Sequence, residues 1–449
     1  MDAAERQRIV EENRLEYGEA YGSMRWTTPE ESSRAEAERA ALLDDLEGRV
    51  SWGCGNAKAD CRTLSGGCRA CAERSWSCLF VNGVCNARCF YCPSEQREVG
   101  EPTTNTLPFA RPEHYAAYLK RFGFRGSSMS GGEPLLSFDR TIRYLTAARR
   151  ALGSEGWLWM YTNGILLTRE KLERLGETGL DEIRLDLSAN GYELGALRLA
   201  SEHVGTVTVE IPAIPEDEER VRGLLPELAR SGVKHLNLHE LRCTPYNLGR
   251  LLGRGAVFRH GARVTVVGSE LAALRLLSAS LDAPASPAVN YCSFIYKHRY
   301  QGSAARRRAA EAWLEGWESV SDAGYVRRSA ARGTGAELDA ALTRLLSSGA
   351  DPKLWRMDRG AGRLELHPSL LAHAAGLALT VSYERSTLRP SVSYRHPFRE
   401  LELGDGPAVF VERETALAEQ SLASGGLAAL PRGIRERYEE LGEGLDPYF

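Results

Sequence analysis

The chain has 449 residues, and its 57 basic and 60 acidic side chains nearly cancel. This length allows two or three domains, and the balanced charge gives no indication of nucleic acid or an anionic membrane as a partner. The first twenty residues are charged, and no long apolar run follows them. The sequence therefore predicts neither a signal peptide nor a spanning helix, and we expect a cytoplasmic protein.

Residues 1–48 are rich in Glu, Arg and Ala and predict an N-terminal helical extension. Residues 49–77 are rich in Cys, Gly and Ser, and their weak periodicity predicts a loop that is organised by metal rather than by a core. Eight of the ten cysteines lie between Cys54 and Cys92. A disulfide framework would be spread over a small secreted domain, so this concentration indicates metal binding in a reducing compartment.

The upstream cysteines predict an auxiliary metal site. They are Cys54, Cys61, Cys68, Cys71 and Cys78. Cys68-x-x-Cys71 is a strong local chelate, and four ligands can be drawn from the five, or three together with Cys243 or Cys292. Thiolates suit a second [4Fe-4S] cluster and a structural zinc alike. We favour the cluster, and Cys78 has the alternative of being a buried strand residue.

From residue 77 onward, apolar strands alternate with helical segments. The expected strands lie in the segments 77–84, 126–134, 156–164, 182–189, 206–214 and 233–241. The expected helices lie at 112–122, 139–151, 170–176, 192–199 and 217–230. Six such units indicate an α/β fold with a parallel sheet, and the span is too short for an eight-fold barrel. We therefore predict a partial (β/α)6 barrel over 78–281, with 264–269 and the helix 270–279 as one further pair.

A linker is expected at 282–289, followed by a C-terminal α+β region over 290–449 that covers the barrel or binds substrate. Its expected helices span 304–319 and 336–348, and its expected antiparallel strands span 378–384, 390–395 and 400–404.

The segment 290–300 is dense in polar aromatic residues and cations. Cys292 could return a hydrogen atom to a product radical or ligate a metal, and Lys297 and Arg299 could anchor a carboxylate or phosphate. The alternative is a strand packed on the barrel.

Three cysteines, Cys85, Cys89 and Cys92, follow the first strand in the run Cys-Asn-Ala-Arg-Cys-Phe-Tyr-Cys-Pro. Three thiolates with this spacing can hold one [4Fe-4S] cluster and leave its fourth iron open to a small molecule. A zinc knuckle or a chance cluster of cysteines is the alternative. Active groups should lie at the C-terminal ends of the barrel strands, where this loop begins.

The next strand ends carry further polar motifs. Gly131 and Gly132 of the run Ser130–Pro134 let the backbone approach a ligand closely, and the carbonyls and Glu133 can accept hydrogen bonds from an ammonium group. Thr162 and Asn163 end the third strand, and we select Ser188 at the fourth; each could bind a ribose or carboxylate, or be a plain polar strand end.

His239 and Glu240 end the sixth strand. Either could serve as an acid–base group for a substrate at the barrel mouth, or His239 could be a hydrogen-bonded wall residue.

The CxxxCxxC pattern with Tyr91 before its last cysteine, the Gly-Gly-Glu-Pro run and the Thr-Asn-Gly run resemble the radical S-adenosylmethionine (radical SAM) superfamily. The resemblance covers residues 77–241 and implies that the open iron chelates S-adenosylmethionine, with Tyr91 near the adenine. It also implies reductive cleavage to a 5′-deoxyadenosyl radical that removes a hydrogen atom from a substrate. A reductase such as flavodoxin or ferredoxin would supply the electron.

Three reaction classes stay open. The first is dehydration, epimerisation or dehydrogenation of a small natural-product intermediate such as a sugar or aminocyclitol, by a lyase or an oxidoreductase. The others are modification of a peptide or protein, and modification of RNA, against which the missing basic excess counts. A non-enzymatic protein with a structural zinc is the remaining alternative. We rank the small-molecule class first.

Overall fold

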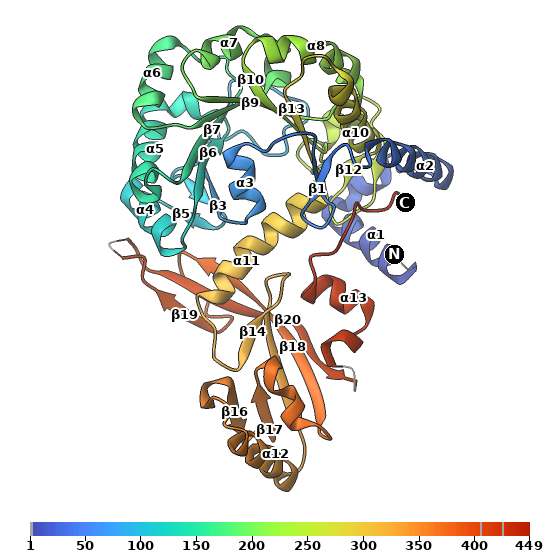
Figure 1. Ribbon diagram of the computed structural model, residues 1–449, viewed down its shortest axis with the longest axis vertical. Helices are drawn as coiled ribbons and strands as arrows, with labels where there is room; N and C mark the ends of the chain where they lie inside the picture. The colour runs from blue at the N-terminus through green and yellow to red at the C-terminus, as the bar shows by residue number, and fades with distance from the viewer. Residues whose placement is uncertain (1–2, 405, 424–425) are drawn as a thin grey trace.

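The computed structural model describes residues 3–404, 406–423 and 426–449 (Figure 1). The described chain forms an eleven-stranded sheet that curls into an open barrel, and a seven-stranded antiparallel sheet from the C-terminal third. The α/β class with a partial barrel is confirmed. None of the described helices is long and apolar enough to cross a bilayer.

Seven parallel strands form the barrel wall in the spatial order β13-β10-β9-β8-β7-β6-β3. Their bounds are β3 (Trp76–Asn82), β6 (Gly126–Gly131), β7 (Trp157–Thr162), β8 (Glu182–Leu185), β9 (Thr206–Pro212), β10 (Val233–His239) and β13 (Ala288–Cys292). The first six are the strands expected from the sequence. The seventh lies where a linker and the start of the C-terminal region were expected, so the sheet continues beyond residue 281.

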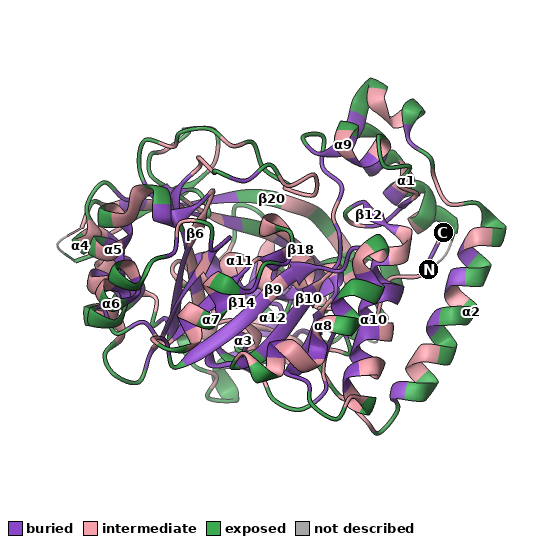
Figure 2. Cartoon of the chain, turned by 90° about the horizontal axis from the view of Figure 1, so that it is seen from above, coloured by how far each residue is buried: buried purple, intermediate pink, exposed green. Residues whose placement is uncertain are grey.

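Helices cover the outer face of this wall (Figure 1). They are α4 (Pro112–Arg121), α5 (Phe138–Leu152), α6 (Arg169–Glu177), α7 (Gly195–Ser201), α8 (Glu218–Arg230) and α10 (Val267–Asp282). Alternate strand residues such as Ile183 and Leu185 point outward and are fully buried against helix residues such as Leu172 and Leu197. Figure 2 shows β9 and β10 largely in the colour of buried residues. This layer between sheet and helices is the main hydrophobic core.

The Cys-rich segment is more regular than expected. It contains the hairpin β1 (Ser51–Gly53) and β2 (Lys58–Asp60), and β2 extends the barrel sheet by pairing antiparallel with β13. The helix α3 (Gly66–Ala72) then packs against β6 and β7, within the ring of strands in Figure 1. A Cβ at Gly66 would collide with the Trp157 ring, which explains why glycine starts this helix. The expectation of a loop without regular structure was therefore wrong.

Of the strand and helix expected at 264–269 and 270–279, only the helix is confirmed as part of the barrel. The helix is α10, but β12 (Thr265–Val266) pairs with β11 (Phe258–Arg259) in a separate two-stranded sheet. The smaller elements near the barrel are β4 (Thr103–Thr104), β5 (Leu107–Pro108), α9 (Leu248–Leu252) and a π-helix (Tyr296–Gln301). The segment 290–300 is thus part barrel strand and part π-helix.

The N-terminal region is helical, as expected, with α1 (Ala3–Tyr17) and α2 (Pro29–Leu46). Thr28 and Glu31 form a capping box at the start of α2. The helix lies along α10, where Arg39 forms a buried ion pair with Glu270 at 3.0 Å.

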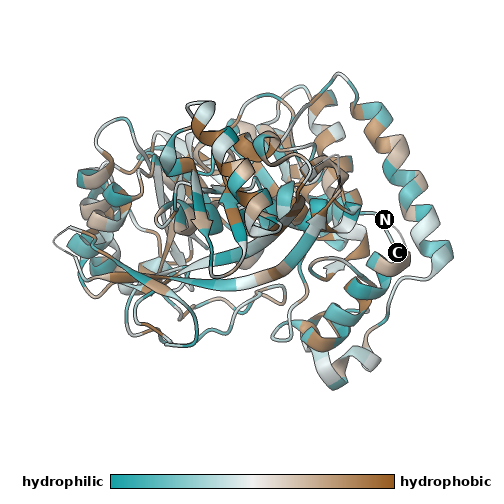
Figure 3. Ribbon diagram, turned by 90° about the horizontal axis from the view of Figure 1, so that it is seen from below, coloured by the Kyte–Doolittle hydropathy of each residue, from teal (hydrophilic) through white to brown (hydrophobic). Residues whose placement is uncertain are grey.

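The C-terminal sheet is antiparallel, as expected. Its strands are β14 (Glu318–Val320), β15 (Val326–Arg332), β16 (Trp355–Asp358), β17 (Arg363–Leu366), β18 (Ala378–Arg389), β19 (Phe398–Leu401) and β20 (Val409–Leu422). The helix α12 (Gly335–Ser347) packs on it, and α11 (Gly302–Glu311) connects it to the barrel. Figure 3 shows many hydrophilic residues on its long strands.

Two expectations for this region were wrong. The helix expected at 304–319 ends at Glu311, and the segment 390–395 is not a strand. Its first residue, Pro390, has no N–H to donate to a ladder.

Candidate active site

The loop that carries Cys85, Cys89 and Cys92 leaves the C-terminal end of β3, as predicted. Side chains from the α9 region hold its backbone. Asn247 Nδ2 donates to the Tyr91 carbonyl at 3.0 Å, and Arg250 Nη1 donates to the Cys89 carbonyl at 3.0 Å. The sequence did not identify these two supports, because no motif links them to the loop 150 or more residues earlier.

The three thiols of this loop influence one another electrostatically. Burial raises the pKa of the Cys85 thiol, and burial raises that of Cys89 to about 11. Nitrogen donors point at two of the sulfurs. The Ala87 amide and Asn163 Nδ2 donate to Cys85 Sγ at 3.4 and 3.7 Å, and Gln96 Nε2 lies 3.9 Å from Cys92 Sγ.

Gly131 and Gly132 bring the end of β6 against the chain that enters this loop. The Gly132 amide donates to the Asn82 carbonyl at 2.9 Å, and the Glu133 amide donates to the Val84 carbonyl at 2.8 Å. A Cβ on Gly131 would collide with the Asn82 oxygen, and one on Gly132 with the Val84 oxygen. Two glycines are therefore needed to position the cysteine loop.

Glu133 is 1 % exposed, and its carboxylate joins the ends of β6 and β7. Thr162 Oγ1 donates to Oε1 at 2.8 Å, the Asn163 amide donates to Oε2 at 2.8 Å, and the Leu135 amide donates to Oε1 at 3.0 Å. Burial raises the pKa of this carboxyl against the effect of these donors. The sequence assigned the Glu133 oxygens to a ligand ammonium, whereas the structure engages them with the chain's own donors.

Tyr91 and Ser188, both predicted site residues, are in contact. Their hydroxyl oxygens are 2.6 Å apart, and Ser188 Oγ donates to Asp186 Oδ1 at 2.5 Å. Burial raises the pKa of Asp186. The sequence passed over Asp186, although its place at the end of the fourth strand was a signal. Ser130, the remaining predicted residue here, is half-buried at the end of β6.

The inward face of the barrel is polar and charged. Arg184 lies between the Trp159 and Tyr161 rings, with its guanidinium carbon 5.1 and 5.4 Å from the ring centroids. It forms ion pairs with Glu182 at 2.8 Å and Glu210 at 2.7 Å. Burial disfavours the charged form of Glu210, but Arg184 and further cations outweigh it and lower the pKa of that carboxyl to about 2.

His239 faces the same interior as Glu210, but Glu240 does not. Burial, with a smaller effect from Lys297, lowers the pKa of His239 to about 3. Glu240 accepts from Arg259 Nη2 at 2.5 Å and from the Phe294 amide at 2.7 Å, so both of its carboxylate oxygens are engaged. The prediction of Glu240 as an acid–base group at the barrel mouth is corrected, because successive residues at a strand end face opposite sides.

The upstream cysteines divide into two groups. Cys54 and Cys71 pack with Cys292 around Tyr296, and Cys68 lies on the same helix as Cys71. Cys61 and Cys78 lie elsewhere. Cys61 Sγ accepts from the Val289 amide at 3.0 Å, and the Cys78 thiol faces Ser128 and Ser130. All ten cysteines are free thiols.

The sequence profile of the Radical SAM superfamily matches residues 79–228, from β3 into α8. That stretch contains the three-cysteine loop, the Gly-Gly-Glu-Pro turn and the Thr-Asn-Gly strand end described above. Residues 79–228 of this chain form a Radical SAM domain.

Two curated proteins have sequences similar to parts of this chain. A protein of Methanocaldococcus jannaschii, which carries the provisional name of a glycyl-radical enzyme activating enzyme, is 27% identical over 277 residues, 59% of this chain and 72% of that protein. The GTP 3′,8-cyclase of Staphylococcus carnosus is 32% identical over 120 residues, 26% of this chain and 34% of the cyclase.

Solved structures with similar parts include methylornithine synthase, with 14% identity, coverage of 61% of this chain and 76% of that one, and a TM-score of 0.32. BtrN in complex with AdoMet and 2-DOIA has 24% identity, coverage of 30% and 56%, and a TM-score of 0.23. These likenesses are low, and the radical SAM assignment does not depend on them.

The cysteine loop fits the radical SAM cluster in the chemistry of its donors. No group of three or more His, Cys, Asp or Glu side chains in the described ranges is placed to hold a metal ion. A cubane instead takes one thiolate for each of three separate irons. N–H groups directed at Cys85 and Cys92 are the contacts that tune such clusters.

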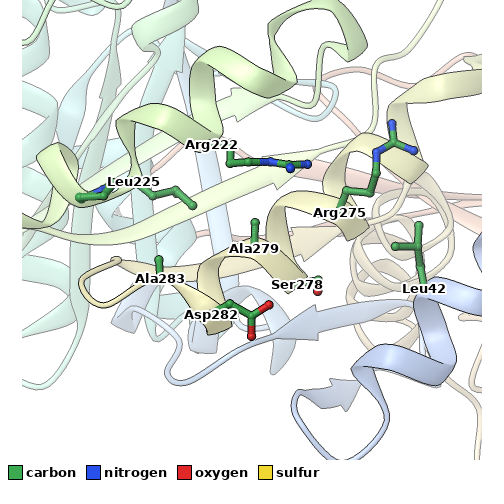
Figure 4. A pocket seen from close by; sticks show the side chains of 9 residues that line it. Leu42, Arg222, Leu225, Arg275, Ser278, Ala279, Asp282 and Ala283 are labelled. Atoms are coloured by element: carbon green, nitrogen blue, oxygen red, sulfur yellow. The ribbon is translucent and has the colours of Figure 1, made fainter.

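Two surface hollows lie away from these radical SAM motifs. One of about 460 Å³ lies on the outside of the barrel, between Leu42 of α2, Arg222 of α8 and Arg275 of α10 (Figure 4). A larger one, of about 1040 Å³, lies between α1, α11 and the C-terminal sheet. Neither is lined by a motif residue, so neither is the candidate active site.

Proposed function

We propose that this radical SAM enzyme cleaves S-adenosylmethionine at a [4Fe-4S] cluster held by Cys85, Cys89 and Cys92 and acts on a small polar substrate in the barrel interior. When bound, the cluster supplies the electron that cleaves the sulfonium and yields a 5′-deoxyadenosyl radical for hydrogen abstraction. A flavodoxin or ferredoxin would serve as reductase, in a reducing cytoplasm.

The chain's own residues would position the two reactants. Glu133 fixes Asn163 beside Cys85, so the third strand end and the cluster loop stay in register. The carbonyls of Gly131 and Gly132 remain the groups suited to an ammonium, since the Glu133 carboxylate is engaged. Tyr91 and Ser188 place two hydroxyls near the loop, where they could bind the adenosine moiety.

The charged barrel interior supports a small polar substrate, and this observation carries the proposal. Barrel interiors are ordinarily filled by Val, Ile and Leu. Here the inward positions of three neighbouring strands hold Arg184, Glu210 and His239. A sugar or aminocyclitol presents hydroxyl and amino groups that match such a surface. Dehydration, epimerisation and dehydrogenation are the reactions that fit.

His239 is the candidate acid–base group, because it is the histidine that faces the barrel interior beside Glu210; burial keeps its imidazole neutral. Cys292 has two alternative roles: a free thiol that returns a hydrogen atom to a product radical, or a metal ligand. We also propose a second thiolate metal site among the upstream cysteines, a cluster or a zinc.

A protein substrate is the second candidate. It is favoured by the relative from M. jannaschii, whose provisional name describes an enzyme that acts on another enzyme. Such a substrate would place a segment of its own chain in the barrel interior, in place of a small molecule.

The deciding experiment follows deuterium. Anaerobic enzyme, reductant and S-adenosylmethionine are incubated with deuterated sugars and aminocyclitols, and with a deuterated peptide, and 5′-deoxyadenosine is examined by mass spectrometry. Deuterium taken from a sugar or aminocyclitol is expected. Deuterium taken only from the peptide would contradict the small-molecule proposal.

A further inference from the structure

Four cysteines from separate parts of the chain surround one buried lysine. Cys54 follows β1, Cys68 and Cys71 lie one turn apart on α3, and Cys292 ends β13. The ammonium of Lys58 lies 2.9 Å from Cys292 Sγ and interacts electrostatically with the sulfurs of Cys68, Cys71 and Cys54. The antiparallel pairing of β2 with β13 places Lys58 directly opposite Cys292.

Lys58 is a buried cation with an unusual set of partners. It is 4 % exposed, and within the described residues its ammonium forms no ion pair with a carboxylate. Its neighbours are the Cys292 sulfur and the Tyr296 ring, whose centroid is 5.5 Å away. Burying an ammonium group is costly unless an anion compensates it. The sulfurs of Cys292, Cys68 and Cys71 are the groups that act most strongly on Lys58, and the Asp60 carboxylate interacts with it electrostatically without forming an ion pair.

Other donors also point at these sulfurs. Tyr296 Oη and Gln301 Nε2 each donate to Cys71 Sγ at 3.0 Å. Asn237 Nδ2 and Arg184 Nη2 donate to Cys68 Sγ at 3.3 and 3.6 Å. A neutral thiol is a weak acceptor, so this convergence of donors is suited to sulfurs that become thiolates when they bind a metal.

We propose that Cys54, Cys68, Cys71 and Cys292 ligate an auxiliary [4Fe-4S] cluster, with Lys58 as its buried counter-cation. This inference rests on the second metal site proposed above and assigns its ligands and its metal. Binding releases the four thiol protons, and the resulting cluster carries net negative charge beside Lys58. Cys292 is then a ligand and not a hydrogen-atom donor.

The geometry favours a cluster over zinc. A zinc site draws four sulfurs to about 2.3 Å from one point. The four sulfurs described here do not converge in that way. A cubane takes each thiolate at a different iron, and the cysteines of the radical SAM loop are likewise spread.

The other cysteines supply matched controls. Cys61 Sγ accepts a backbone amide within the core, and Cys78 faces serines on the neighbouring strand. Neither is among the sulfurs that act most strongly on Lys58. Their replacement by serine is expected to leave the auxiliary site intact.

The test begins with a variant in which Cys85, Cys89 and Cys92 are all changed to alanine. This variant should keep about four irons and four sulfides per chain, against about eight of each in the wild type. Adding Cys68→Ser and Cys71→Ser should remove the remaining iron, whereas adding Cys61→Ser or Cys78→Ser should not. Circular dichroism checks that each variant is folded.

Electron paramagnetic resonance of reduced wild-type protein gives an independent measurement. One cluster signal should change on addition of S-adenosylmethionine and a second should not, and Cys292→Ser should alter only the second. A folded triple variant without iron, or with zinc in its place, would overturn the inference. Iron that survives Cys68→Ser with Cys71→Ser would also overturn it. If the triple variant keeps its iron while the wild type releases no 5′-deoxyadenosine, the proposed function fails and this inference stands.

Discussion

The hydroxyl of Tyr91 donates to both carboxylate oxygens of Asp186, at 3.1 and 2.9 Å. Tyr91 lies in the cysteine loop, which follows β3, and Asp186 follows β8. The contact therefore joins the loop to a strand three positions along the barrel wall from β3. It also directs the Tyr91 ring toward the polar strand ends.

Changing Tyr91 to Phe removes this contact and keeps the ring. Because Asp186 retains Ser188 as a donor, we expect the iron content to stay unchanged and the KM for S-adenosylmethionine to rise several-fold. Iron analysis and the kinetics of 5′-deoxyadenosine release measure the two effects. An unchanged KM would show that the Tyr91 hydroxyl does not position the coenzyme. Tyr394→Phe is the control, since Tyr394 is 80% exposed.

Glu133→Gln should lower the free energy of unfolding, because the buried Glu133 carboxylate accepts hydrogen bonds from Thr162 and Asn163. The Gln amide nitrogen would face a donor, either Asn163 N–H or Thr162 Oγ–H, and a buried hydrogen bond lost in this way costs about 1–3 kcal/mol. Anaerobic urea unfolding measures the loss. Glu173→Gln on the exposed face of α6 should cost almost nothing. Equal losses of stability in the two variants would show that the hydrogen bonds of Glu133 do not stabilise the fold.

Arg184→Met tests the charged interior. The change leaves Glu182 and Glu210 buried without their common cation, and breaking a buried pair costs about 3–5 kcal/mol. Arg169→Met is the control, because the exposed pair of Arg169 with Glu202 at 3.4 Å contributes about 0–1 kcal/mol. The free energies of unfolding of the two variants are compared at pH 7.5. A loss no larger than that of the control would show that the interior charges do not depend on Arg184.

His239 predicts a pH dependence of stability. The pKa of His239 is about 3 in the folded chain and about 6.5 in the unfolded chain. Acid therefore protonates the unfolded chain first, and the contribution of His239 to stability falls as the pH drops below 6.5. Between pH 7.5 and 5.5 the wild type should lose about 1.4 kcal/mol more than His239→Gln does. Anaerobic urea unfolding at the two pH values measures this difference. Equal losses would mean that folded His239 titrates normally.

The repeating strand and helix pattern allowed the first six barrel strands to be predicted from the sequence. The seventh, Ala288–Cys292, was missed because Pro284 and Pro287 in the connection before it are typical of a linker. The helix α3 was missed because it begins with Gly66 and Gly67, which disfavour helices. Both glycines are required by Trp157 and Arg184 on the facing strands, and such contacts are not visible in a linear pattern.

The site shows a similar division. Local motifs identified the cysteine loop and the strand ends, but the partners that arrive from distant segments were not identifiable. Lys58 is one of only six lysines in the chain, yet its place opposite Cys292 depends on the pairing of strands 230 residues apart. The alternation of Glu182, Arg184 and Asp186 along one strand was a signal for a charged interior that the sequence did offer.

The central claim is tested most directly by the products of anaerobic incubation with dithionite and S-adenosylmethionine. The wild type should release methionine and 5′-deoxyadenosine in equal amounts, and Cys89→Ala should release neither while Cys61→Ala behaves as the wild type. Absence of 5′-deoxyadenosine from iron-loaded wild type, or its undiminished release by Cys89→Ala, would contradict the account.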